Sequence, residues 1–393
     1  MYIHRALETH ILELVQEYPV ITLVGPRQSG KTTMAKHLFP SYTYVNLEDP
    51  QTRIFASEDL NGFFHQYGTH LIIDEVQHVP EVLSKIQVLV DEHAQESGQF
   101  ILTGSQEMHS GGIVAQSLAG RTAIFTVLPL SLAELREAGE PILDRDSQLL
   151  HGFMPRVYQT QTSRVFDYYA GYVATYVQRD IKMVTAIQDE MVFQKFLVLL
   201  AGRVGSLLNY TSLANDLGIS RQTVERWTSL LTSSHIIHLL PPWFPSRTSS
   251  IVKTPKVYFH DTGVASMLLG IESKDQMMRD PLRGSLFENM IVMEALKQRV
   301  NMHRPPNLYF FRNSSGLEVD LLYQQQRMLI PYEIKSSEQF HKDQFASLEK
   351  FRKAYPSHLH ETEQGGLIYA GHDSCTFSGY RVTPFVLAGD LFG

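Results

Sequence analysis

The sequence has very little cysteine, no long apolar stretch and no strong excess of one charge. Its single cysteine, Cys375, excludes an internal disulfide, so we expect the reducing environment of the cytoplasm. No stretch reaches the roughly 18 uncharged apolar residues of a membrane helix, and the opening MYIHRALETH lacks the apolar centre of a signal peptide. These absences argue against a membrane protein or a secreted protein.

The charge is distributed unevenly along the chain. The formal net charge of -7 over 393 residues does not indicate that the whole chain binds nucleic acid. Residues 151–270, however, hold 11 Lys and Arg against 7 Asp and Glu, whereas residues 1–150 hold 9 against 19. The middle third is therefore where a polyanion is expected to bind.

Short apolar runs alternate with helical patterns in the first third of the chain. After an amphipathic helix expected over residues 2–18, the runs at 20–25, 43–48, 70–75 and 99–105 predict buried strands. This alternation is typical of a parallel sheet and of the α/β class. Strands return after residue 305, as LYFFR, LEVDLLY and MLIPYEIK.

The chain, at 393 residues, is longer than a single hydrophobic core usually supports, so two or three domains are expected. We predict an α/β domain over 1–144 with a parallel sheet. A mainly helical middle domain with a winged helix follows over 145–270. An α/β domain over 271–393 ends the chain.

The stretch GPRQSGKT matches the P-loop pattern G-x-x-x-x-G-K-[ST], and it lies between a predicted strand and a predicted helix, as the pattern requires. Backbone N–H groups of residues 28–32 would surround the phosphates of ATP. Lys31 would reach the β- and γ-phosphates, and the Thr32 hydroxyl would bind Mg²⁺. The predicted nucleotide loop comprises Gly25, Pro26, Arg27, Gln28, Ser29, Gly30, Lys31, Thr32 and Thr33.

Two acidic residues follow the third predicted strand. Asp74 would hold Mg²⁺ through water, and Glu75 would polarise the attacking water. The alternative is that both acids merely begin a helix, where acids are favoured. The P-loop upstream favours the first interpretation. It also favours hydrolysis over passive binding, because a nucleotide clamp does not need the base Glu75.

Further side chains could assist at the phosphate site. Thr103 and Ser105, at the end of the next strand, could sense the γ-phosphate or the attacking water, or they could form an ordinary turn. Arg121 could stabilise charge on the transferred phosphoryl group, or it could be a surface arginine. Arg27 is expected to shape the loop or contact a neighbour.

Residues 209–243 have the pattern of a helix-turn-helix followed by the first strand of a wing. One short helix ends at Gly218, and Ser220 caps a second helix that runs to about residue 232. The start of the second helix usually meets base edges or phosphates. We therefore predict DNA contacts by Arg221, Gln222, Thr223 and Arg226. The alternative is a winged helix that binds protein, and the stretch PPWFPSRTSS is a wing or an inter-domain strap.

The stretch PYEIKSS places Glu333 and Lys335 two residues apart in a predicted strand, so their side chains point the same way. The E-x-K pattern alone is weak, since it also occurs by chance at residues 272–274. The preceding strand should pair with this one and bring Asp320 beside Glu333, and Glu288 can reach the same place from a helix.

This layout is typical of a metal-dependent phosphodiesterase. Glu288, Asp320 and Glu333 would bind a hard cation such as Mg²⁺. Lys335 would position or deprotonate water, or neutralise charge in the transition state. The alternative is a purely structural cluster of salt bridges.

Through these motifs the chain resembles a family of bacterial and archaeal P-loop ATPases. Its members combine an AAA-type domain, a winged helix and a C-terminal domain related to restriction-endonuclease-like, PD-(D/E)XK-type nucleases. The resemblance covers essentially the whole chain, through GPRQSGKTT, LIIDEVQ, ILTGSQ, SLAGR, PLSLAEL, VYFHDTGVASMLLG, GSLFENMIVMEAL, EVDLLY and YEIKSS. It implies that Arg121 lies near the nucleotide. It also implies that Asp320, Glu333 and Lys335 form the nuclease-like signature. For residues 260–263 we expect only a structural turn.

The first hypothesis is a cytoplasmic, Mg²⁺-dependent ATPase that binds DNA, including branched or single-stranded DNA. It would couple ATP binding or hydrolysis to DNA remodelling or to cleavage by the C-terminal domain, as a homo-oligomer. The alternative is a nucleotide-switched signalling or scaffold ATPase, whose winged helix and inactive nuclease-like domain bind protein partners. A transcription regulator is a third hypothesis. Stimulation of ATP turnover by DNA would distinguish the first from the second.

Overall fold

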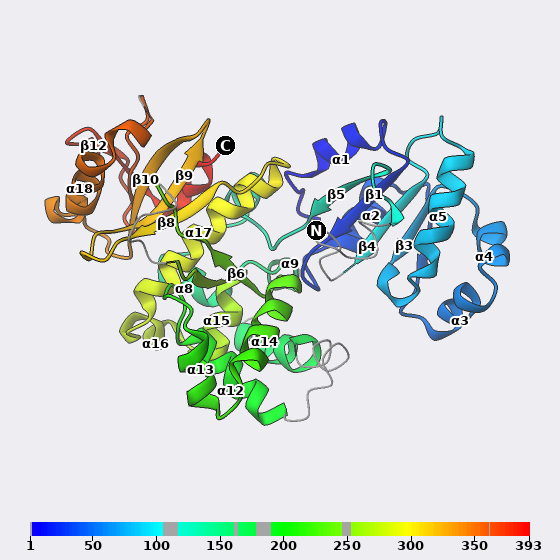
Figure 1. Ribbon diagram of the computed structural model, residues 1–393, viewed down its shortest axis with the longest axis horizontal. Helices are drawn as coiled ribbons and strands as arrows, with labels where there is room; N and C mark the ends of the chain where they lie inside the picture. Colours follow the sequence, from blue (N-terminus) through cyan, green and yellow to red (C-terminus); the bar gives the residue numbers. More distant parts are fainter. Residues whose placement is uncertain (1, 105–116, 161–163, 178–189, 246–252, 361) are drawn as a thin grey trace.

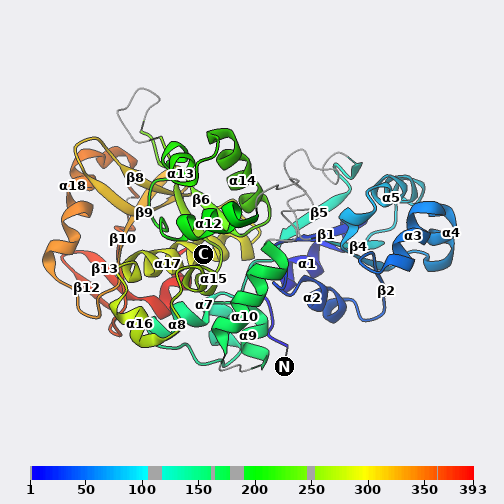
Figure 2. The same cartoon turned by 90° about the horizontal axis from the view of Figure 1, so that it is seen from below.

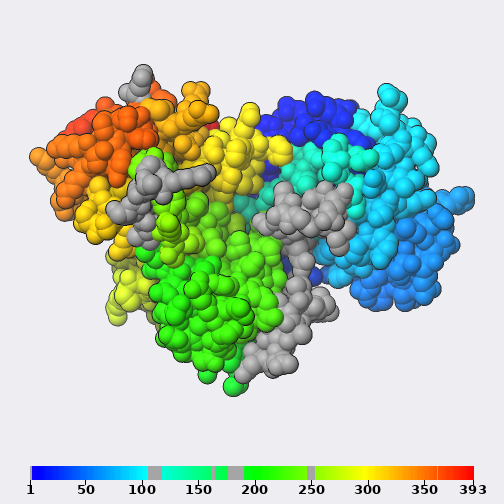
Figure 3. Space-filling model, viewed as in Figure 1, coloured from blue at the N-terminus to red at the C-terminus, as the bar shows by residue number. Residues whose placement is uncertain are grey.

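The computed structural model describes residues 2–104, 117–160, 164–177, 190–245, 253–360 and 362–393. Figure 1 shows an N-terminal lobe, coloured blue to cyan, beside a larger body formed by the rest of the chain. In the space-filling view, yellow atoms of the larger body lie beside the blue atoms of the N-terminal lobe (Figure 3). Among the described residues, no helix combines the length and the apolar character needed to cross a membrane.

The N-terminal lobe is built on a five-stranded parallel sheet, as the alternating pattern predicts. The strand order is β2-β3-β4-β1-β5. Strands β1, β3 and β4 are buried along their whole length, which explains their continuous apolar sequences. The strands are β1 (Val20–Val24), β2 (Thr43–Asn46), β3 (Leu71–Asp74), β4 (Phe100–Gly104) and β5 (Thr122–Thr126).

Helices cover both faces of this sheet. One apolar cluster joins α1 and α2 to one face, and a second joins α3, α4 and α5 to the other. These helices are α1 (Glu8–Leu14), α2 (Lys31–Leu38), α3 (Pro50–Glu58), α4 (Leu60–Tyr67) and α5 (Glu81–Glu92).

The first helix is shorter than its apolar pattern predicts. Residues 2–5 have no regular structure, and α1 begins at Glu8. The reason is tertiary, because Arg5 is buried and donates hydrogen bonds to Glu134, to the Ser29 carbonyl and to the Leu128 carbonyl. These contacts fix the opening segment beside the nucleotide loop instead of in a helix.

The middle of the chain is mainly helical and packs below the other parts in Figure 1. Its aromatic-rich helices bury a shared core that includes Tyr169, Phe193 and Trp227. The helices are α7 (Leu132–Glu137), α8 (Arg145–His151), α9 (Pro155–Thr160), α10 (Val165–Tyr172), α12 (Glu190–Ala201), α13 (Tyr210–Leu217), α14 (Arg221–Ser233), α15 (Thr262–Leu268) and α16 (Lys274–Arg279).

The helix pair α13 and α14 has the caps that the sequence predicts. Gly218 follows α13 in the left-handed conformation, and the Ser220 hydroxyl accepts a hydrogen bond from the Thr223 N–H at the start of α14. Strand β6 (Ile237–Leu240) comes next and pairs antiparallel with β7 (Lys256–Phe259). The order helix, turn, helix and antiparallel strand pair therefore agrees with the predicted pattern of elements.

Residues 260–263 do more than form a turn. Asp261 caps α15 by accepting from the Gly263 and Val264 N–H groups, and it also accepts from the Phe153 N–H at 2.6 Å. A Cβ on Gly263 would lie 2.1 Å from the Tyr169 ring. This segment therefore joins α15 to α10 and to the loop after α8.

The C-terminal part contains a six-stranded sheet of order β12-β13-β11-β10-β9-β8. Apolar side chains of α17 pack with Ile330, Tyr332 and Ile334, whereas those of α18 pack with Leu322 and Leu329, so the two helices cover opposite faces. The elements are α17 (Arg283–Asn301), β8 (Leu308–Arg312), β9 (Glu318–Gln325), β10 (Met328–Lys335), α18 (Ala346–Ala354), β11 (Gly366–Tyr369), β12 (Cys375–Phe377) and β13 (Tyr380–Pro384).

A strap after β6 ties the middle part to the C-terminal sheet. Pro242 forms a parallel bridge with Phe310 of β8, and the Trp243 N–H donates to the Phe310 carbonyl at 2.8 Å. The Trp243 ring is buried among Phe311, Phe351 and other aromatic side chains. One apolar cluster contains Ile3 and side chains between Leu128 and Phe392, so the middle and C-terminal parts share a core.

Candidate functional site

The nucleotide loop begins where β1 meets β5. Gly25 has φ of 143°, and a Cβ there would lie 2.3 Å from the Val127 carbonyl oxygen. No side chain fits at this position, so the first glycine of the pattern is required by close packing. Gly30, with φ of 97°, then begins α2 at its N-terminus.

The lysine of the loop is buried and points into it. Lys31 Nζ donates to the Gly25 carbonyl at 3.0 Å and to the Pro26 carbonyl at 2.9 Å. These two carbonyls hold the Lys31 ammonium group inside the loop that is predicted to bind the phosphates. Gln28 accepts a hydrogen bond from the Tyr168 hydroxyl at 2.7 Å, so α10 contacts the loop directly.

The carboxylate of Asp74, the last residue of β3, accepts hydrogen bonds from hydroxyl groups of α2, β2 and β4. The Thr32 hydroxyl donates to its two carboxylate oxygens at 3.1 and 3.0 Å. The Tyr44 hydroxyl of β2 donates at 2.7 Å, and the Thr103 hydroxyl of β4 also donates to this carboxylate. Carboxylate and hydroxyl oxygens are ligands that Mg²⁺ prefers, so Thr32 and Asp74 fit the predicted cation.

Glu75 follows directly, in the left-handed conformation with φ of 55°. The Gln77 side-chain amide donates to its carboxylate, and the Glu75 N–H donates weakly to the Thr103 hydroxyl at 3.4 Å. A strained backbone at this position costs of the order of 1 kcal/mol and is common at functional sites. Both Asp74 and Glu75 line the same cavity as the loop.

This cavity has a volume of about 510 Å³. The sequence-predicted residues that line it are Arg27, Gln28, Ser29, Gly30, Lys31, Thr32, Thr33, Asp74 and Glu75. Arg27 also forms an ion pair with Glu48 at 2.8 Å. Of the other predicted residues, Gly25 and Pro26 accept from Lys31 and Thr103 contacts Asp74, while Ser105 lies outside the described residues.

The opposite wall of the cavity was not identified from the sequence. It is formed by Tyr2 and Arg5 of the opening segment and by Pro155, Arg156 and Gln159 of α9. In both ribbon views the start of the chain lies near α9 (Figure 2). No local motif marks these residues, because only the tertiary fold brings α9 to the nucleotide loop.

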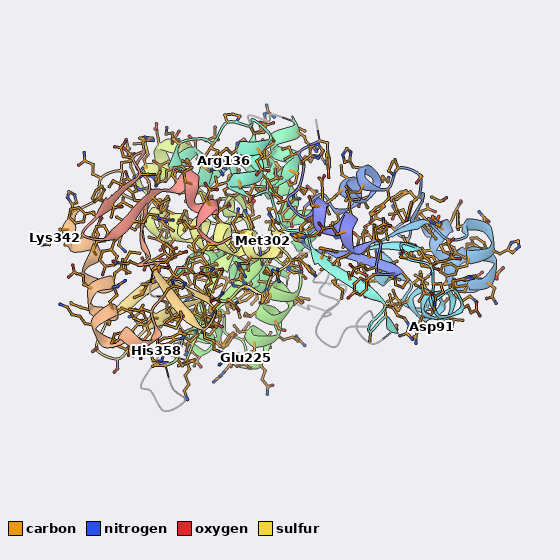
Figure 4. The ribbon with its side chains drawn as sticks, turned by 90° about the horizontal axis from the view of Figure 1, so that it is seen from above. Asp91, Arg136, Glu225, Met302, Lys342 and His358 are labelled. Atoms are coloured by element: carbon orange, nitrogen blue, oxygen red, sulfur yellow. The ribbon has the colours of Figure 1, made fainter. Side chains whose placement is uncertain are left out.

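Arg121 does not lie near the nucleotide loop of its own chain, contrary to what the resemblance implies. It directly precedes β5, and its carbonyl accepts from the Val20 N–H at the first residue of β1. The loop follows the last residue of β1, roughly 15 Å away along the strand. Arg121 instead forms a two-bond ion pair with Asp91, which lies at an edge of the N-terminal lobe (Figure 4).

The C-terminal carboxylates meet as predicted from the strand pairing. Lys335 Nζ lies 3.0 Å from Asp320 Oδ2 and 2.6 Å from Glu333 Oε2. The Ile334 N–H donates to Asp320 Oδ2 at 2.9 Å. Glu333 Oε1 is buried and has no hydrogen-bond partner within the described part of the protein. An orphaned carboxylate oxygen beside a second carboxylate fits a site for a hard cation.

The electrostatics of this cluster separate the two acids. Burial raises the pKa of Glu333, and the neighbouring Asp320 carboxylate raises it further, well above its usual value. Burial acts the same way on Asp320, but Lys335, Lys256 and the Ile334 N–H outweigh it and lower the pKa of Asp320. Asp320 is therefore the ionised member of the pair, and Glu333 holds a proton more readily.

Glu288 lies near Asp320 but does not complete a three-acid cation site. Burial and the nearby Asp320 carboxylate raise the pKa of Glu288, although Lys256 acts in the opposite direction. Among the described residues, no group of three containing Glu288, Asp320 and Glu333 has ligand atoms all within 4.8 Å. A group that meets this distance, His4, Glu8 and His37, lies on the N-terminal lobe instead. Glu288 accepts hydrogen bonds from Lys256 and Tyr258 of β7. Its role as a metal ligand therefore stays a prediction.

The residues predicted to contact DNA lie at the start of α14. Arg221, Gln222 and Arg226 are exposed, whereas Thr223 contributes to the cap with Ser220. Arg221 also pairs with Glu225 at 2.8 Å, and Glu225 points outward from the body (Figure 4). The arginines are thus accessible, although one is partly neutralised by its neighbour.

Three family models match successive parts of the chain. Residues 17–136 match a family described as AAA domain. Residues 143–275 and 283–387 match two families described as domains of unknown function, DUF8612 and DUF4143.

Similar proteins and structures cover most of the chain at low identity. An uncharacterized protein of Mycobacterium tuberculosis is 28% identical over 81% of this chain and 70% of its own length. A Walker-type ATPase of Pyrococcus abyssi has a TM-score of 0.43 and 14% identity, covering 68% of this chain and 96% of that one. The Thermotoga maritima RuvB Holliday junction branch migration motor has a TM-score of 0.34 and 20% identity, covering 61% and 90%.

The family match and the geometry agree for the N-terminal lobe. The match over 17–136 includes the nucleotide loop, Asp74 and Glu75, and it ends within α7. The parallel sheet and the lysine-containing loop are the features that a P-loop fold requires. Residues 17–136 therefore match a family described as AAA domain, and they have the parallel sheet and the lysine-containing loop of a P-loop fold.

Proposed function

We propose that this protein is a Mg²⁺-dependent ATPase that acts on DNA through its middle and C-terminal parts. The observation that carries the ATPase proposal is the arrangement of Lys31, Thr32, Asp74 and Glu75 around one cavity of about 510 Å³. Mg²⁺ held at Thr32 and Asp74 would neutralise phosphate charge. Lys31 would bind the terminal phosphates, and Glu75 would orient and polarise the attacking water.

The ATPase proposal is tested by two substitutions with different expected effects. Lys31→Ala removes a cation that binds phosphate, so both nucleotide affinity and turnover should fall. Glu75→Gln keeps the shape of the site, so nucleotide binding should persist while turnover falls about 100-fold or more. Equal turnover in wild type and Glu75→Gln would refute the assigned role of Glu75.

The C-terminal proposal is a phosphodiesterase-type site of the restriction-endonuclease-like kind. The strands β9 and β10 supply Asp320, Glu333 and Lys335, and the buried, unpartnered Glu333 oxygen supports cation binding. A cation bound there would stabilise charge on a phosphodiester, and Lys335 would orient water or the phosphate oxygen. DNA would reach this site from α14, whose exposed arginines are phosphate-binding groups.

This part is tested by incubating labelled DNA of several shapes with Mg²⁺ or Mn²⁺, with and without ATP. Single strands, duplexes, flaps and four-way junctions should be compared, with Asp320→Ala as the control. Cleavage that Asp320→Ala loses would support a nuclease. DNA that is bound but stays intact in every mixture would assign this region to binding alone.

The second candidate is a nucleotide-switched scaffold whose C-terminal part is inactive. One observation favours it. Lys256 and Tyr258 donate hydrogen bonds to the carboxylate of Glu288, which is the expected third acid of the cation site. A scaffold should hydrolyse ATP at the same rate with and without DNA. For the ATPase that acts on DNA we expect stimulation, and a homo-oligomer would let Arg121 of one copy approach the nucleotide of another.

A further inference from the structure

Strand β7 brings two polar side chains into the C-terminal carboxylate cluster. Lys256 has a side chain only 3% exposed, and its Nζ lies 2.9 Å from Glu288 Oε1 and 2.7 Å from Glu318 Oε1. The Tyr258 hydroxyl donates to the same Glu288 oxygen at 2.6 Å. Both residues belong to the strand pair that follows α14, so another part of the fold supplies them.

These contacts decide where Glu288 points. Asp320 and Glu333 are bridged by Lys335, whereas Glu288 is held by Lys256 and Tyr258. Within the described ranges, these three acids do not bring their oxygens within 4.8 Å of one another. A buried ammonium group in contact with a carboxylate satisfies the same lone pairs that a divalent cation would use.

We propose that Lys256 competes with a divalent cation for Glu288 and so keeps this acid out of the cation site. The inference rests on the proposed cation-binding function of Asp320 and Glu333. Lys256 is a positioning residue here, because it acts on Glu288 and touches no substrate. Its position on β7 makes the strand pair β6 and β7 the element that sets how many acids face the cation.

The arrangement allows Glu288 to be released without leaving a buried charge unpaired. When Glu288 turns away, Lys256 keeps Glu318 as its partner at 2.7 Å. Glu318 is in turn shared with Arg312 at 3.5 Å. An unpaired buried ammonium would be strongly unfavourable, so the second acid makes exchange between two states feasible.

The test measures Mn²⁺ binding by electron paramagnetic resonance on the full chain, without nucleotide. Binding at the C-terminal site is defined as the part that Asp320→Asn abolishes. Lys256→Met should raise the affinity of this site at least tenfold, because Glu288 then becomes available as a third acid. The gain should disappear in the double variant Lys256→Met, Glu288→Gln. Lys253→Met, an exposed lysine just upstream, should leave the affinity unchanged.

A milder variant protects the test against misfolding. Tyr258→Phe removes one of the two bonds that hold Glu288 and keeps the ring, and it should raise the Mn²⁺ affinity about two- to threefold. An unchanged or lower affinity in Lys256→Met and in Tyr258→Phe would overturn the competition by Lys256 while leaving the cation site in place. Absence of any Asp320-dependent Mn²⁺ binding in all variants would instead refute the cation site itself.

Discussion

At the scale of single residues, three hydroxyl groups orient the Asp74 carboxylate. Asp74 accepts from Thr32, Tyr44 and Thr103, and these residues come from α2, β2 and β4. The motif identified Thr32 and Asp74, but nothing in the sequence marked Tyr44. Its role depends on the register of β2 with β3, which places Asn46 opposite Asp74 and Tyr44 two residues before it.

Replacing Tyr44 by Phe should weaken Mg²⁺ binding at the nucleotide site. The substitution removes one hydrogen bond that orients Asp74, a loss of about 1 kcal/mol. The Mg²⁺ concentration that half-saturates nucleotide binding should therefore rise about fivefold, as measured by fluorescent nucleotide titration. Tyr42→Phe is the matched control, because the Tyr42 hydroxyl donates to the Gly98 carbonyl away from the site. An equal Mg²⁺ requirement in Tyr44→Phe and Tyr42→Phe would show that Tyr44 does not contribute to Mg²⁺ binding.

At the scale of elements, strands and caps were predictable and tertiary contacts were not. The bounds of β8 and β10 coincide with the predicted runs LYFFR and MLIPYEIK, since alternation and buried apolar content are local properties. The predicted helix over residues 2–18 is longer than α1 at both ends, and at its start the reason is that Arg5 is bound by distant groups. The nucleotide loop and Asp74 were likewise predictable from sequence motifs. Arg156 at the nucleotide cavity and Lys256 beside Glu288 were not, because only the tertiary fold brings them there.

The junction of β1, β5 and the nucleotide loop should tolerate no side chain at Gly25. In Gly25→Ala the Cβ would meet the Val127 carbonyl at 2.3 Å, and a positive φ of 143° adds strain. The free energy of unfolding should fall by about 3 kcal/mol or more. In Gly218→Ala the backbone is also left-handed but nothing lies within 4 Å, so about 1 kcal/mol is expected. Chemical denaturation of both variants gives the comparison, and equal losses would contradict it.

Helix α14 should contribute to DNA binding mainly through phosphates. Arg226→Ala removes one exposed charge from this helix. Affinity for duplex DNA should fall, and the slope of log affinity against log salt should decrease by about 1. Lys353→Ala, an exposed charge on α18, serves as the control. An unchanged slope in Arg226→Ala would exclude this face of α14 from the DNA contact.

At the scale of the whole molecule, α17 connects the two candidate sites. Near its start, Glu288 contacts β7. Further along, Glu294 accepts from the Leu132 N–H and Lys297 donates to the Leu130 carbonyl, in the segment that follows the N-terminal sheet. Met302, just after the helix, lies at the junction of the two bodies (Figure 4). The helix is buried on nearly all sides, and its sequence accordingly has no separate polar face.

The stability of the whole molecule should depend on pH through the half-buried His238 and the buried His260. Burial lowers the pKa of His238 to about 4, and His260 beside it is also shifted downward by burial. Between pH 6.5 and 4 the unfolded chain therefore takes up a proton at His238 that the folded chain does not, so stability falls as the pH falls.

His238→Asn should make this decline shallower by roughly 1 kcal/mol per pH unit. Unfolding in denaturant at several pH values checks the slope, and His372→Asn, at an exposed position, is the control. Parallel slopes for wild type and His238→Asn would show that His238 is protonated equally in both states.

The positions of the two tryptophans give the protein a built-in optical reporter. Trp227 packs edge-on against Phe193 in the helical core, and Trp243 is enclosed by aromatic rings beside the C-terminal sheet. The N-terminal lobe contains none. Any change in tryptophan emission when nucleotide is added must therefore arise outside the N-terminal lobe. Fluorescence of the unlabelled chain would thus register communication between the lobes, and quenching would identify which ring responds.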